Sequence, residues 1–588
     1  MHTYNNLAKR INLTVIALCM LTIFFFSVAI TRPAAAASNL ILQNQVLLFT
    51  NPSDVTFTIT GSSTSVTWNV KNSSDEILQE GTTEPDGTTN LVHLQPIVTG
   101  YYTLTFSAEG NDPITAAFGV TGPALSKNNY YSIQTLSAHT AGFWRNDMAR
   151  ITPMLKSIGF SARRDSAYWD EFEQTQGNYV TTPVVQGILD IDQQNDMSLF
   201  WTAGRGNSLY DNGLVVSTPE GILAYAKYID AFLTQHPEIK QVELLNEFNG
   251  NSNSACGATA TCYVAIAQGV YEYVKPLHPD VEIVAGGTSS YSQSWWNEYF
   301  AAGGNAYADA FSYHPYNLAT YRLNEVATAL TNQIKSHNNG VGKPIYMSEI
   351  GWSITDSTTG NAAKVSTEKQ QADRIVYSFV APQANPEIAS VNWYNGIDYG
   401  STPTEYGFGI FKRPTTNIRG YQPKQAAIAF YQMRKQLEGY TFSRTEMLAP
   451  TARAYVFTNQ AGDTQKVVWR TDTFWSKDEA TIPVTITTSG EKYSTVTDTA
   501  GRRVASFDTN AASFDQDVSL SPLFIVSSNT APPVDEIPTT PSNEEPGLIP
   551  GVPNTGILGF LNRPQPLLIM GLGIVSAVTI FRLRKRNQ

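Results

Sequence analysis

Two glutamates, Glu247 and Glu349, each stand at the end of a short apolar run that has the pattern of a buried strand. The first run covers residues 241–246 and the second residues 344–348, and residues typical of loops follow both. The carboxyl ends of parallel strands meet at one edge of a sheet, so the two carboxylates would converge there. Cleavage of a glycosidic bond needs such a pair, with one carboxylate as acid/base and the other as nucleophile or base.

The region that would position both glutamates, residues 129–440, alternates between strand-like and helix-like segments. The expected strands are residues 132–137, 160–164, 198–203, 241–246, 282–286, 308–313, 344–348 and 389–394. Amphipathic helices are expected between them, for example at residues 219–235 with Ser217 or Thr218 as the cap, 367–380 and 424–437. Eight such units predict an α/β fold, a (β/α)8 TIM barrel.

A doubly wound open sheet is the alternative for the same alternation of strands and helices. That fold usually has fewer strands and carries a phosphate-binding glycine loop after its first strand. The segment Gly204-Arg205-Gly206 lacks the third glycine of such a loop and is not followed by a helix start. The barrel is therefore the favoured prediction.

Short alternating runs on both sides of the barrel predict two further domains. Residues 39–121 have the pattern of an Ig-like β-sandwich, for which packing or spacing is the expected role and glycan binding the alternative. Residues 441–528 return to short β runs and predict a C-terminal β-sandwich, packed on the barrel because no linker precedes it. A chain of 588 residues has the length for three to four domains.

The composition favours an extracellular protein that handles carbohydrate. Charged residues make up 15% of the chain and aromatic residues 11%, with 29 tyrosines. Sugar rings stack on aromatic faces, although other extracellular proteins share this composition. The net charge of -11 argues against nucleic acid as a partner, since phosphate binding needs clustered lysine and arginine.

The N-terminus has the pattern of a signal peptide, predicted over residues 1–37. Lys9 and Arg10 precede an apolar run at residues 13–30, and four alanines at residues 34–37 supply the small residues for cleavage before Ser38. An uncleaved membrane anchor is the alternative. In both cases the rest of the chain lies outside the membrane, which predicts an extracellular protein.

The three cysteines predict one local disulfide. Cys19 lies in the signal peptide, which leaves Cys256 and Cys262 with five polar or small residues between them. Two reduced thiols are the alternative. No metal site is predicted, because this pair has no nearby histidines to complete a ligand set.

The C-terminus carries a second localisation signal. Residues 529–556 are rich in proline, threonine and glutamate and predict an extended linker, and residues 557–588 predict a hydrophobic anchor with a basic tail. The segment Pro553-Asn554-Thr555-Gly556 resembles the P-x-T-G part of a cell-wall sorting signal, which implies a sortase as partner. Val552 stands where that signal usually has leucine, so anchoring in the membrane by the C-terminal helix is an equal alternative.

The barrel region resembles the retaining glycoside hydrolases of clan A, nearest to family 39 and related family 5 enzymes. The resemblance covers most of residues 129–437 and is carried by five ordered segments. They are residues 164–169 with Glu173, Gly177 and Tyr179, residues 206–211, residues 243–249, residues 312–316 and residues 348–352. The proline that often follows the strand-4 glutamate in the family is replaced here by Phe248.

This resemblance implies Glu247 as general acid/base and Glu349 as nucleophile. Glu247 would have to be protonated at the outset, so we expect burial and the charge of Glu349 to raise its pKa. Arg164 would keep Glu349 ionised. For retention of configuration, the two carboxyl groups should lie about 5–5.5 Å apart.

The family also implies substrate-binding residues around the pair. Asn246 would bond the sugar 2-hydroxyl, His314 or Tyr316 would orient the nucleophile or the substrate, and Trp393 would be a stacking platform. Structural roles are the alternatives: for Arg164 an ion pair with Asp165 or Glu247, for His314 a place in the core, and for Trp393 packing inside the barrel. His139 is equally consistent with a subsite and with a structural role.

Together these features predict a secreted, surface-anchored retaining O-glycoside hydrolase that cleaves a polysaccharide or oligosaccharide and needs no cofactor. The alternative is a catalytically inactive carbohydrate-binding surface protein on the same scaffold. The presence of both Glu247 and Glu349 favours the enzyme, because inactive relatives of enzymes usually lose one catalytic residue.

Overall fold

The computed structural model describes residues 39–137, 147–250, 254–316, 318, 322–355, 364–399, 407–471, 480–488, 493–508 and 512–528. The predicted signal peptide, linker, sorting motif and C-terminal anchor lie outside these residues, as does His139. Within the described ranges, no helix combines the length and the apolar character that crossing a membrane requires.

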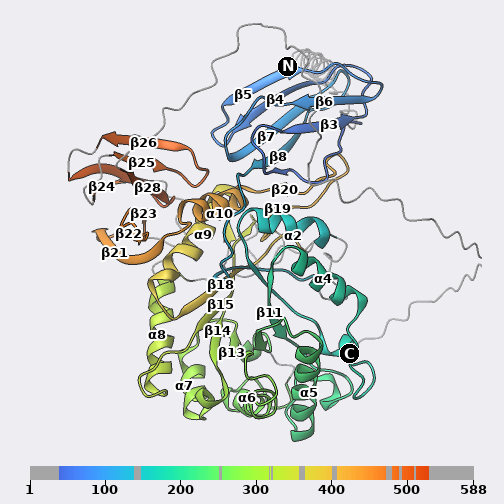
Figure 1. The fold of residues 1–588 in the computed structure, drawn as a ribbon, viewed down its shortest axis with the longest axis vertical. Coiled ribbons are helices and arrows are strands. Elements are labelled where there is room, and N and C mark those ends of the chain that lie inside the picture. Colours follow the sequence, from blue (N-terminus) through green and yellow to red (C-terminus); the bar gives the residue numbers. More distant parts are fainter. Residues whose placement is uncertain are drawn as a thin grey trace, which may run out of the picture. The chain divides into compact units, whose positions relative to one another are not determined.

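Parallel strands close into an eight-stranded barrel, as the alternating pattern predicted (Figure 1). In chain order they are β9 (Tyr131–Gln134), β10 (Ala162–Asp165), β11 (Ser198–Ala203), β12 (Gln241–Leu244), β13 (Glu282–Thr288), β14 (Ala310–Tyr313), β15 (Ile345–Ile350) and β18 (Ile388–Trp393). The last strand pairs in parallel with the first, which closes the barrel and excludes the doubly wound sheet.

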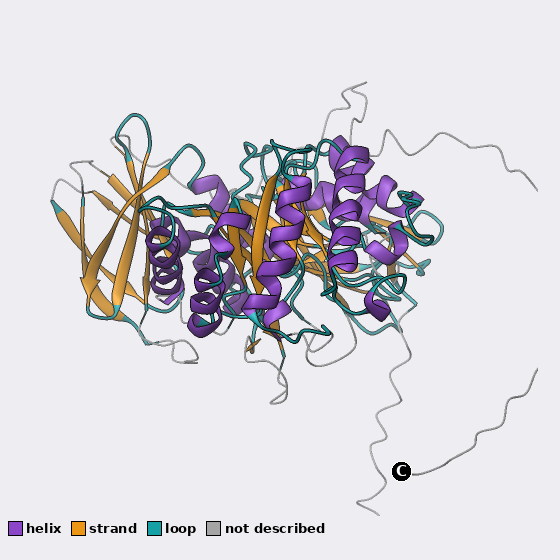
Figure 2. Ribbon diagram, turned by 90° about the horizontal axis from the view of Figure 1, so that it is seen from below, coloured by secondary structure: helices purple, strands orange, loops and turns teal. Residues whose placement is uncertain are grey.

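Helices surround the barrel strands (Figure 2). The main ones are α2 (Met148–Ser157), α4 (Pro183–Gln194), α5 (Pro219–Gln235), α6 (Ala260–Val274), α7 (Gln293–Ala301), α8 (Arg322–Ser336), α9 (Glu368–Val380) and α10 (Gln425–Gln436). Side-chain caps mark the starts of several of these helices: the Thr218 hydroxyl accepts from the Gly221 N–H at the start of α5, and Thr367 caps α9 in the same way. Proline occupies the first turn of α4 and α5, where its missing N–H costs nothing.

Residues before the barrel form two sheets that enclose their own apolar core. One has the order β1 (Ile41–Leu42), β3 (Thr56–Thr60), β6 (Thr89–His93), and the other β2 (Leu48–Phe49), β8 (Ile114–Val120), β7 (Gly100–Ser107), β4 (Thr67–Asn72), β5 (Ile77–Thr82). This is the predicted sandwich arrangement, and it contacts the barrel segment directly. The Ala117 N–H donates to Gln422 Oε1 (3.0 Å), and the Tyr101 hydroxyl donates to Glu368 Oε2 (3.3 Å).

Residues after the barrel form a second pair of sheets, again as predicted. The larger has the order β21 (Thr441–Ala449), β22 (Ala452–Thr458), β23 (Thr464–Arg470), β28 (Leu523–Ser528), β25 (Tyr493–Thr497), β26 (Arg503–Asp508), and the smaller pairs β24 (Ile482–Thr487) with β27 (Ser513–Val518). Trp469 of β23 packs on Tyr377 of α9 with ring centroids 5.0 Å apart, so these sheets contact the barrel helices. The exact domain boundaries stay predictions.

A buried ion pair ties the segment after β18 to the start of α10. Lys424, only 2% exposed, donates from Nζ to Asp398 Oδ1 (2.6 Å) and to the Gly407 carbonyl (3.1 Å). The Gly409 N–H also donates to Asp398 Oδ1. Burial raises the pKa of Asp398 and lowers that of Lys424, so each charge depends on the other.

Replacing Lys424 by methionine is expected to destabilise the protein by about 3–5 kcal/mol, because it leaves the Asp398 carboxylate buried without its counter-charge. The measurement is the shift of the unfolding midpoint in urea. The control is Lys412→Met, which breaks a partly exposed ion pair with Glu368 and should cost no more than about 1 kcal/mol. Equal losses in the two variants would contradict a special role for the buried pair.

Candidate active site

A buried arginine joins the polar side chains at the carboxyl ends of the barrel strands. Arg164 on β10 points into the barrel, whereas its neighbour Arg163 points outward and donates to Asp192 on α4. The Arg164 guanidinium donates from Nη1 to Glu349 Oε2 (3.1 Å) and from Nη2 to Asn246 Oδ1 (2.7 Å). Because successive side chains of a strand point to opposite faces, Arg164 reaches Glu349 and Asn246, and three of the predicted site residues lie together.

Arg164 forms an ion pair with neither Asp165 nor Glu247, the two partners expected if its role were only structural. Asp165 is occupied elsewhere, since it accepts hydrogen bonds from Thr135 and Ser137. The ion pairs of Arg164 are with Glu349 and with Glu243, which belongs to the segment 243–249 but had no predicted role. Burial alone would lower the pKa of Arg164, but these two carboxylates raise it overall.

Glu349 lies within β15, one residue before its end, rather than just after the strand as predicted. The pairing of β15 with β18 shifts register between Met347 and Ile350, which marks an irregularity at this position. The Glu349 side chain is 15% exposed, and its Oε1 accepts a hydrogen bond from the Tyr316 hydroxyl (2.7 Å). Both of its oxygens are thus held, one by Arg164 and the other by Tyr316.

Glu247 lies in a tight turn beyond β12, which ends at Leu244 and not at residue 246 as expected. Leu245 (φ 64°) and Glu247 (φ 49°) both adopt the left-handed region, so the strand cannot continue through them. Such residues cost on the order of 1–3 kcal/mol each and persist only where the surroundings hold them. Here the Glu247 N–H donates to the carbonyl of Gly287 (2.7 Å), which locks the turn against β13.

His314 lies between the two carboxylates, directly after β14. Its ring is fully buried, and Nδ1 is 3.0 Å from Glu247 Oε1 and 3.9 Å from Glu349 Oε2. Those two oxygens are therefore at most about 7 Å apart, which is compatible with the separation of about 5–5.5 Å between the carboxyl groups of retaining glycosidases. The pattern of strand-end residues correctly grouped His314, Glu247 and Glu349.

The pKa of Glu247 is shifted in the direction opposite to the expected one. Burial raises it, but the hydrogen bond and charge of His314, together with the charge of Arg164, outweigh burial and hold the pKa below its usual range. The expectation of a raised pKa is wrong because it left out His314 as a partner of Glu247. Tyr316 behaves differently: burial and the neighbouring Glu349 raise its pKa well above the usual value.

Two predicted substrate-binding residues are not part of this cluster. Trp393 is fully buried and packs on Trp352 with ring centroids 5.8 Å apart, which is the barrel-packing alternative. With no exposed surface it presents no face to a sugar, so we do not assign it a platform role. His139 lies outside the described residues and stays a prediction.

Three polar residues to which the sequence prediction assigned no role complete the cluster around Arg164. Glu243 Oε2 accepts from Arg164 Nε (2.8 Å), Arg164 Nη2 (2.6 Å) and the Thr202 hydroxyl (3.0 Å). Gln134 Oε1 accepts from Arg164 Nη1 (2.8 Å). The signal for Glu243 was available, since a carboxylate inside an apolar strand must have a buried counter-charge.

Glu173, one of the residues that carried the family resemblance, has a structural role in this protein. Its carboxylate accepts from the Trp169 indole N–H (2.6 Å), the Gly177 N–H (2.6 Å) and the Tyr210 hydroxyl (2.7 Å). These bonds connect the segment after β10 with the segment after β11. The motif is thus explained by loop geometry at the barrel mouth and not by chemistry.

The predicted disulfide between Cys256 and Cys262 is present. It joins the segment after β12 to the first turn of α6, so it braces the connection that follows Glu247. Among the described side chains, no group of three or more histidine, cysteine, aspartate or glutamate residues could hold a metal ion.

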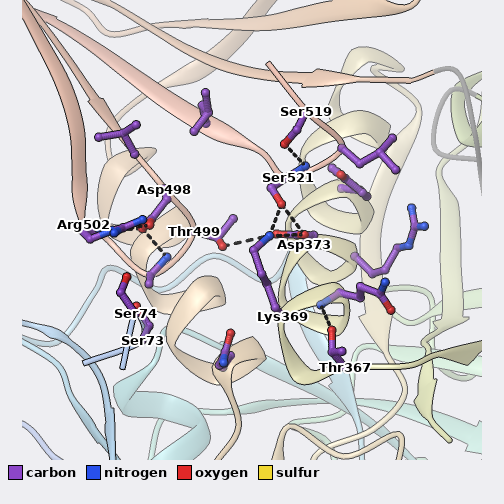
Figure 3. A pocket seen from close by; sticks show the side chains of 18 of the residues that line it. Ser73, Ser74, Thr367, Lys369, Asp373, Asp498, Thr499, Arg502, Ser519 and Ser521 are labelled. Carbon is purple, nitrogen blue, oxygen red and sulfur yellow. Dashed lines mark hydrogen bonds and ion pairs between the residues drawn. The ribbon is translucent and has the colours of Figure 1, made fainter. Parts of the chain in front are cut away.

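A cavity of about 430 Å³ lies apart from this cluster, between α9 and the C-terminal sheets (Figure 3). Asp373 of α9 lies in its wall and accepts from the Ser521 hydroxyl (2.8 Å), Lys369 Nζ (3.2 Å) and the Thr499 hydroxyl (3.5 Å). These contacts fasten the C-terminal sheets to α9. The residues that line the cavity include none of the polar cluster around Arg164.

Comparisons with known proteins relate the chain to glycoside hydrolases by structure. No family model matches the sequence, and no curated protein matches it. A family 39 glycoside hydrolase from the gut symbiont Bacteroides cellulosilyticus WH2 superposes with a TM-score of 0.67 at 18% identity, covering 83% of this chain and all of that one. A monomeric beta-xylosidase from Caulobacter crescentus CB15 gives a TM-score of 0.49 at 13% identity, with 69% of this chain and 98% of that chain covered. The first of these shows that the fold is shared.

Proposed function

We propose that this protein is a retaining O-glycoside hydrolase, with Glu349 as nucleophile and Glu247 as general acid/base. The observation that carries the proposal is the arrangement of the two carboxylates at the carboxyl ends of β12 and β15, both within 4 Å of the same nitrogen of His314. Active sites of (β/α)8 enzymes form at this end of the barrel. The shared fold of a family 39 enzyme supports the same chemistry.

In the first step, a Glu349 oxygen attacks the anomeric carbon while Glu247 donates its proton to the leaving oxygen. The glycosidic bond breaks, and a covalent glycosyl-enzyme forms. Arg164 and Tyr316 each bond one oxygen of Glu349, which fixes the plane of its carboxylate before the attack. Asn246, exposed beside Glu247 and oriented by Arg164, is placed to bond the sugar.

In the second step, Glu247 takes a proton from water as the water attacks the same carbon, and Glu349 is released as a carboxylate. Glu247 must therefore be protonated when substrate is bound. Its side chain is 40% exposed, and a sugar that covers it removes that solvent, which raises its pKa. The opposing effect of His314 keeps this proton labile enough to be donated.

The location of the enzyme is part of the same proposal. The signal-peptide pattern at residues 1–37 and the anchor-like C-terminus at residues 557–588 would place the barrel outside the cell and attach it to the membrane or, through a sortase, to the cell wall. A polysaccharide or oligosaccharide outside the cell is then the substrate.

The function is tested by incubating the protein with a panel of plant, fungal and bacterial glycans and analysing reducing-end products. Release of sugar with retained anomeric configuration, followed by NMR at early times, is the expected result. If the wild type releases no sugar but binds a glycan, and Glu349→Gln leaves that binding unchanged, the protein is a carbohydrate-binding surface protein instead.

A His314→Gln variant is expected to shift the alkaline limb of the kcat/KM profile to higher pH. That limb reports the loss of the Glu247 proton, and His314 lowers the pKa of Glu247, so removing the imidazole raises it. The matched variant is Tyr316→Phe, which touches Glu349 and not Glu247 and should leave the alkaline limb in place. An alkaline limb that does not move in His314→Gln would argue against this assignment.

A further inference from the structure

Glu243, a fully buried residue of β12, accepts two of the hydrogen bonds that Arg164 donates. We infer that Glu243 is a positioning residue which competes with Glu349 for the Arg164 guanidinium and thereby sets the reactivity of the nucleophile. The inference rests on the proposed function and concerns how that site is tuned.

The hydrogen bonds of Arg164 are divided unequally between Glu243 and Glu349. Two of its N–H groups, on Nε and Nη2, converge on one oxygen of Glu243, at 2.8 and 2.6 Å. Glu349 receives a single and longer bond of 3.1 Å from Nη1. The paired face of the guanidinium, which binds a carboxylate most strongly, is therefore occupied by Glu243 and not by the nucleophile.

Glu243 and Arg164 are both buried beneath the site. Glu243 is fully buried in β12, and Arg164 is 2% exposed. A carboxylate in such a position is costly unless it is paired, so the two residues form one ionic unit beneath the active site. Their charges largely cancel, and Glu349 faces a partly neutralised arginine.

The reaction itself limits how strongly Arg164 can bind Glu349. Glu349 must lose its negative charge when it bonds to the sugar, so a cation that binds it too strongly stabilises the starting state and slows the attack. Glu243 limits this effect by holding Arg164. It also lies near Glu247, where its charge favours the protonated form needed for acid catalysis.

Among the described residues, the charged and titratable groups that face Glu349 come from three parts of the barrel. Arg164 from β10, His314 and Tyr316 from the segment after β14, and Glu247 from the turn after β12 surround Glu349. Glu243 faces Arg164 and His314. Removing the charge of Glu243 should therefore shift both ionisations of the catalytic pair toward lower pH.

The test is the variant Glu243→Gln, with kcat/KM measured against pH on the best substrate of the glycan panel. We expect both limbs of the profile to move down by about one pH unit, and the glycosylation rate to fall about tenfold or more. Glu243→Asp, which restores a carboxylate, should recover part of the shift. Asp192→Asn is the matched control, since it removes the buried partner of Arg163 on the outer side of the same strand.

The pH profile distinguishes an effect of Glu243 on the ionisation of the two glutamates from a role of Glu243 in stability alone. Loss of stability in both Glu243→Gln and Asp192→Asn, with neither profile shifted, would overturn the inference. If Glu243→Gln does not fold, Thr202→Val serves instead: it removes the hydroxyl that binds Glu243 Oε2 (3.0 Å), so Glu243 holds Arg164 more strongly and the acid limb should move up.

A second measurement does not depend on turnover. Titration of glutamate carboxyls by 13C NMR, with the Glu349 signal identified by its loss in Glu349→Gln, reports the Glu349 ionisation directly. A Glu349 titration that moves to lower pH in Glu243→Gln supports the inference even if no glycan is cleaved, and an unchanged titration overturns it. An inactive wild type with a shifted titration would overturn only the proposed function.

Discussion

Replacing Glu349 by glutamine is expected to lower kcat by about 10⁴-fold or more, because the amide cannot form the glycosyl-enzyme intermediate. The substitution keeps the size and shape of the side chain. The amide oxygen can still accept a hydrogen bond from Arg164 or Tyr316, which now bind the two carboxylate oxygens. Folding and glycan binding should therefore persist while catalysis is lost.

The measurement is single-turnover hydrolysis on the best substrate, together with trapping by a 2-deoxy-2-fluoro glycoside. This reagent should label the wild type at Glu349 and leave the variant unlabelled. Glu282→Gln is the control, since Glu282 is a barrel carboxylate at the opposite, amino end of β13 and bonds to Tyr346. Residual activity within tenfold of the wild type in Glu349→Gln would remove Glu349 from the role of nucleophile.

The fold was largely predictable because local patterns determine it. Most barrel strands are short, largely apolar runs, and the observed strands overlap all eight expected ranges. The helix over residues 219–235 was predicted with its observed bounds, and of the two expected caps, Ser217 and Thr218, the structure shows Thr218. Strand ends were less accurate where the backbone turns sharply, as it does at Leu245 and Glu247.

The candidate catalytic cluster was predictable for a different reason. In a closed barrel, all residues at the carboxyl ends of the strands face one opening, so residues from β10, β12, β14 and β15 must lie near each other. Arg164, Glu247, His314 and Glu349 were found in this way, and the structure places them in direct contact.

The contacts inside the cluster were not predictable, because they depend on side-chain directions and on strands that are not neighbours. Glu247 follows β12 and His314 follows β14, and strand β13 lies between these two strands. A sequence does not reveal that the two side chains meet, so the pKa of Glu247 was expected to move in the wrong direction. The stacking role predicted for Trp393 was not recovered either, because the pattern of β18 does not show that its ring turns into the core.

Replacing Glu247 by alanine is expected to lower kcat/KM on a natural glycan by about 10²–10⁴-fold, because the leaving oxygen then departs without a proton. An aryl glycoside whose leaving group needs no proton should lose far less in the first step. Hydrolysis of the glycosyl-enzyme then becomes limiting, since no residue activates water. The kinetic signature is a burst of released phenol followed by slow turnover.

Azide distinguishes the role of Glu247 from that of Glu349, because it needs no general base and fits the space of the deleted carboxylate. In Glu247→Ala, azide should restore turnover and give a glycosyl azide with the configuration of the substrate. In Glu349→Ala, it should instead attack from the side of the missing nucleophile and give the inverted product. The same anomeric product from both variants would mean that the two glutamates do not divide the reaction as their contacts with Arg164 and His314 indicate.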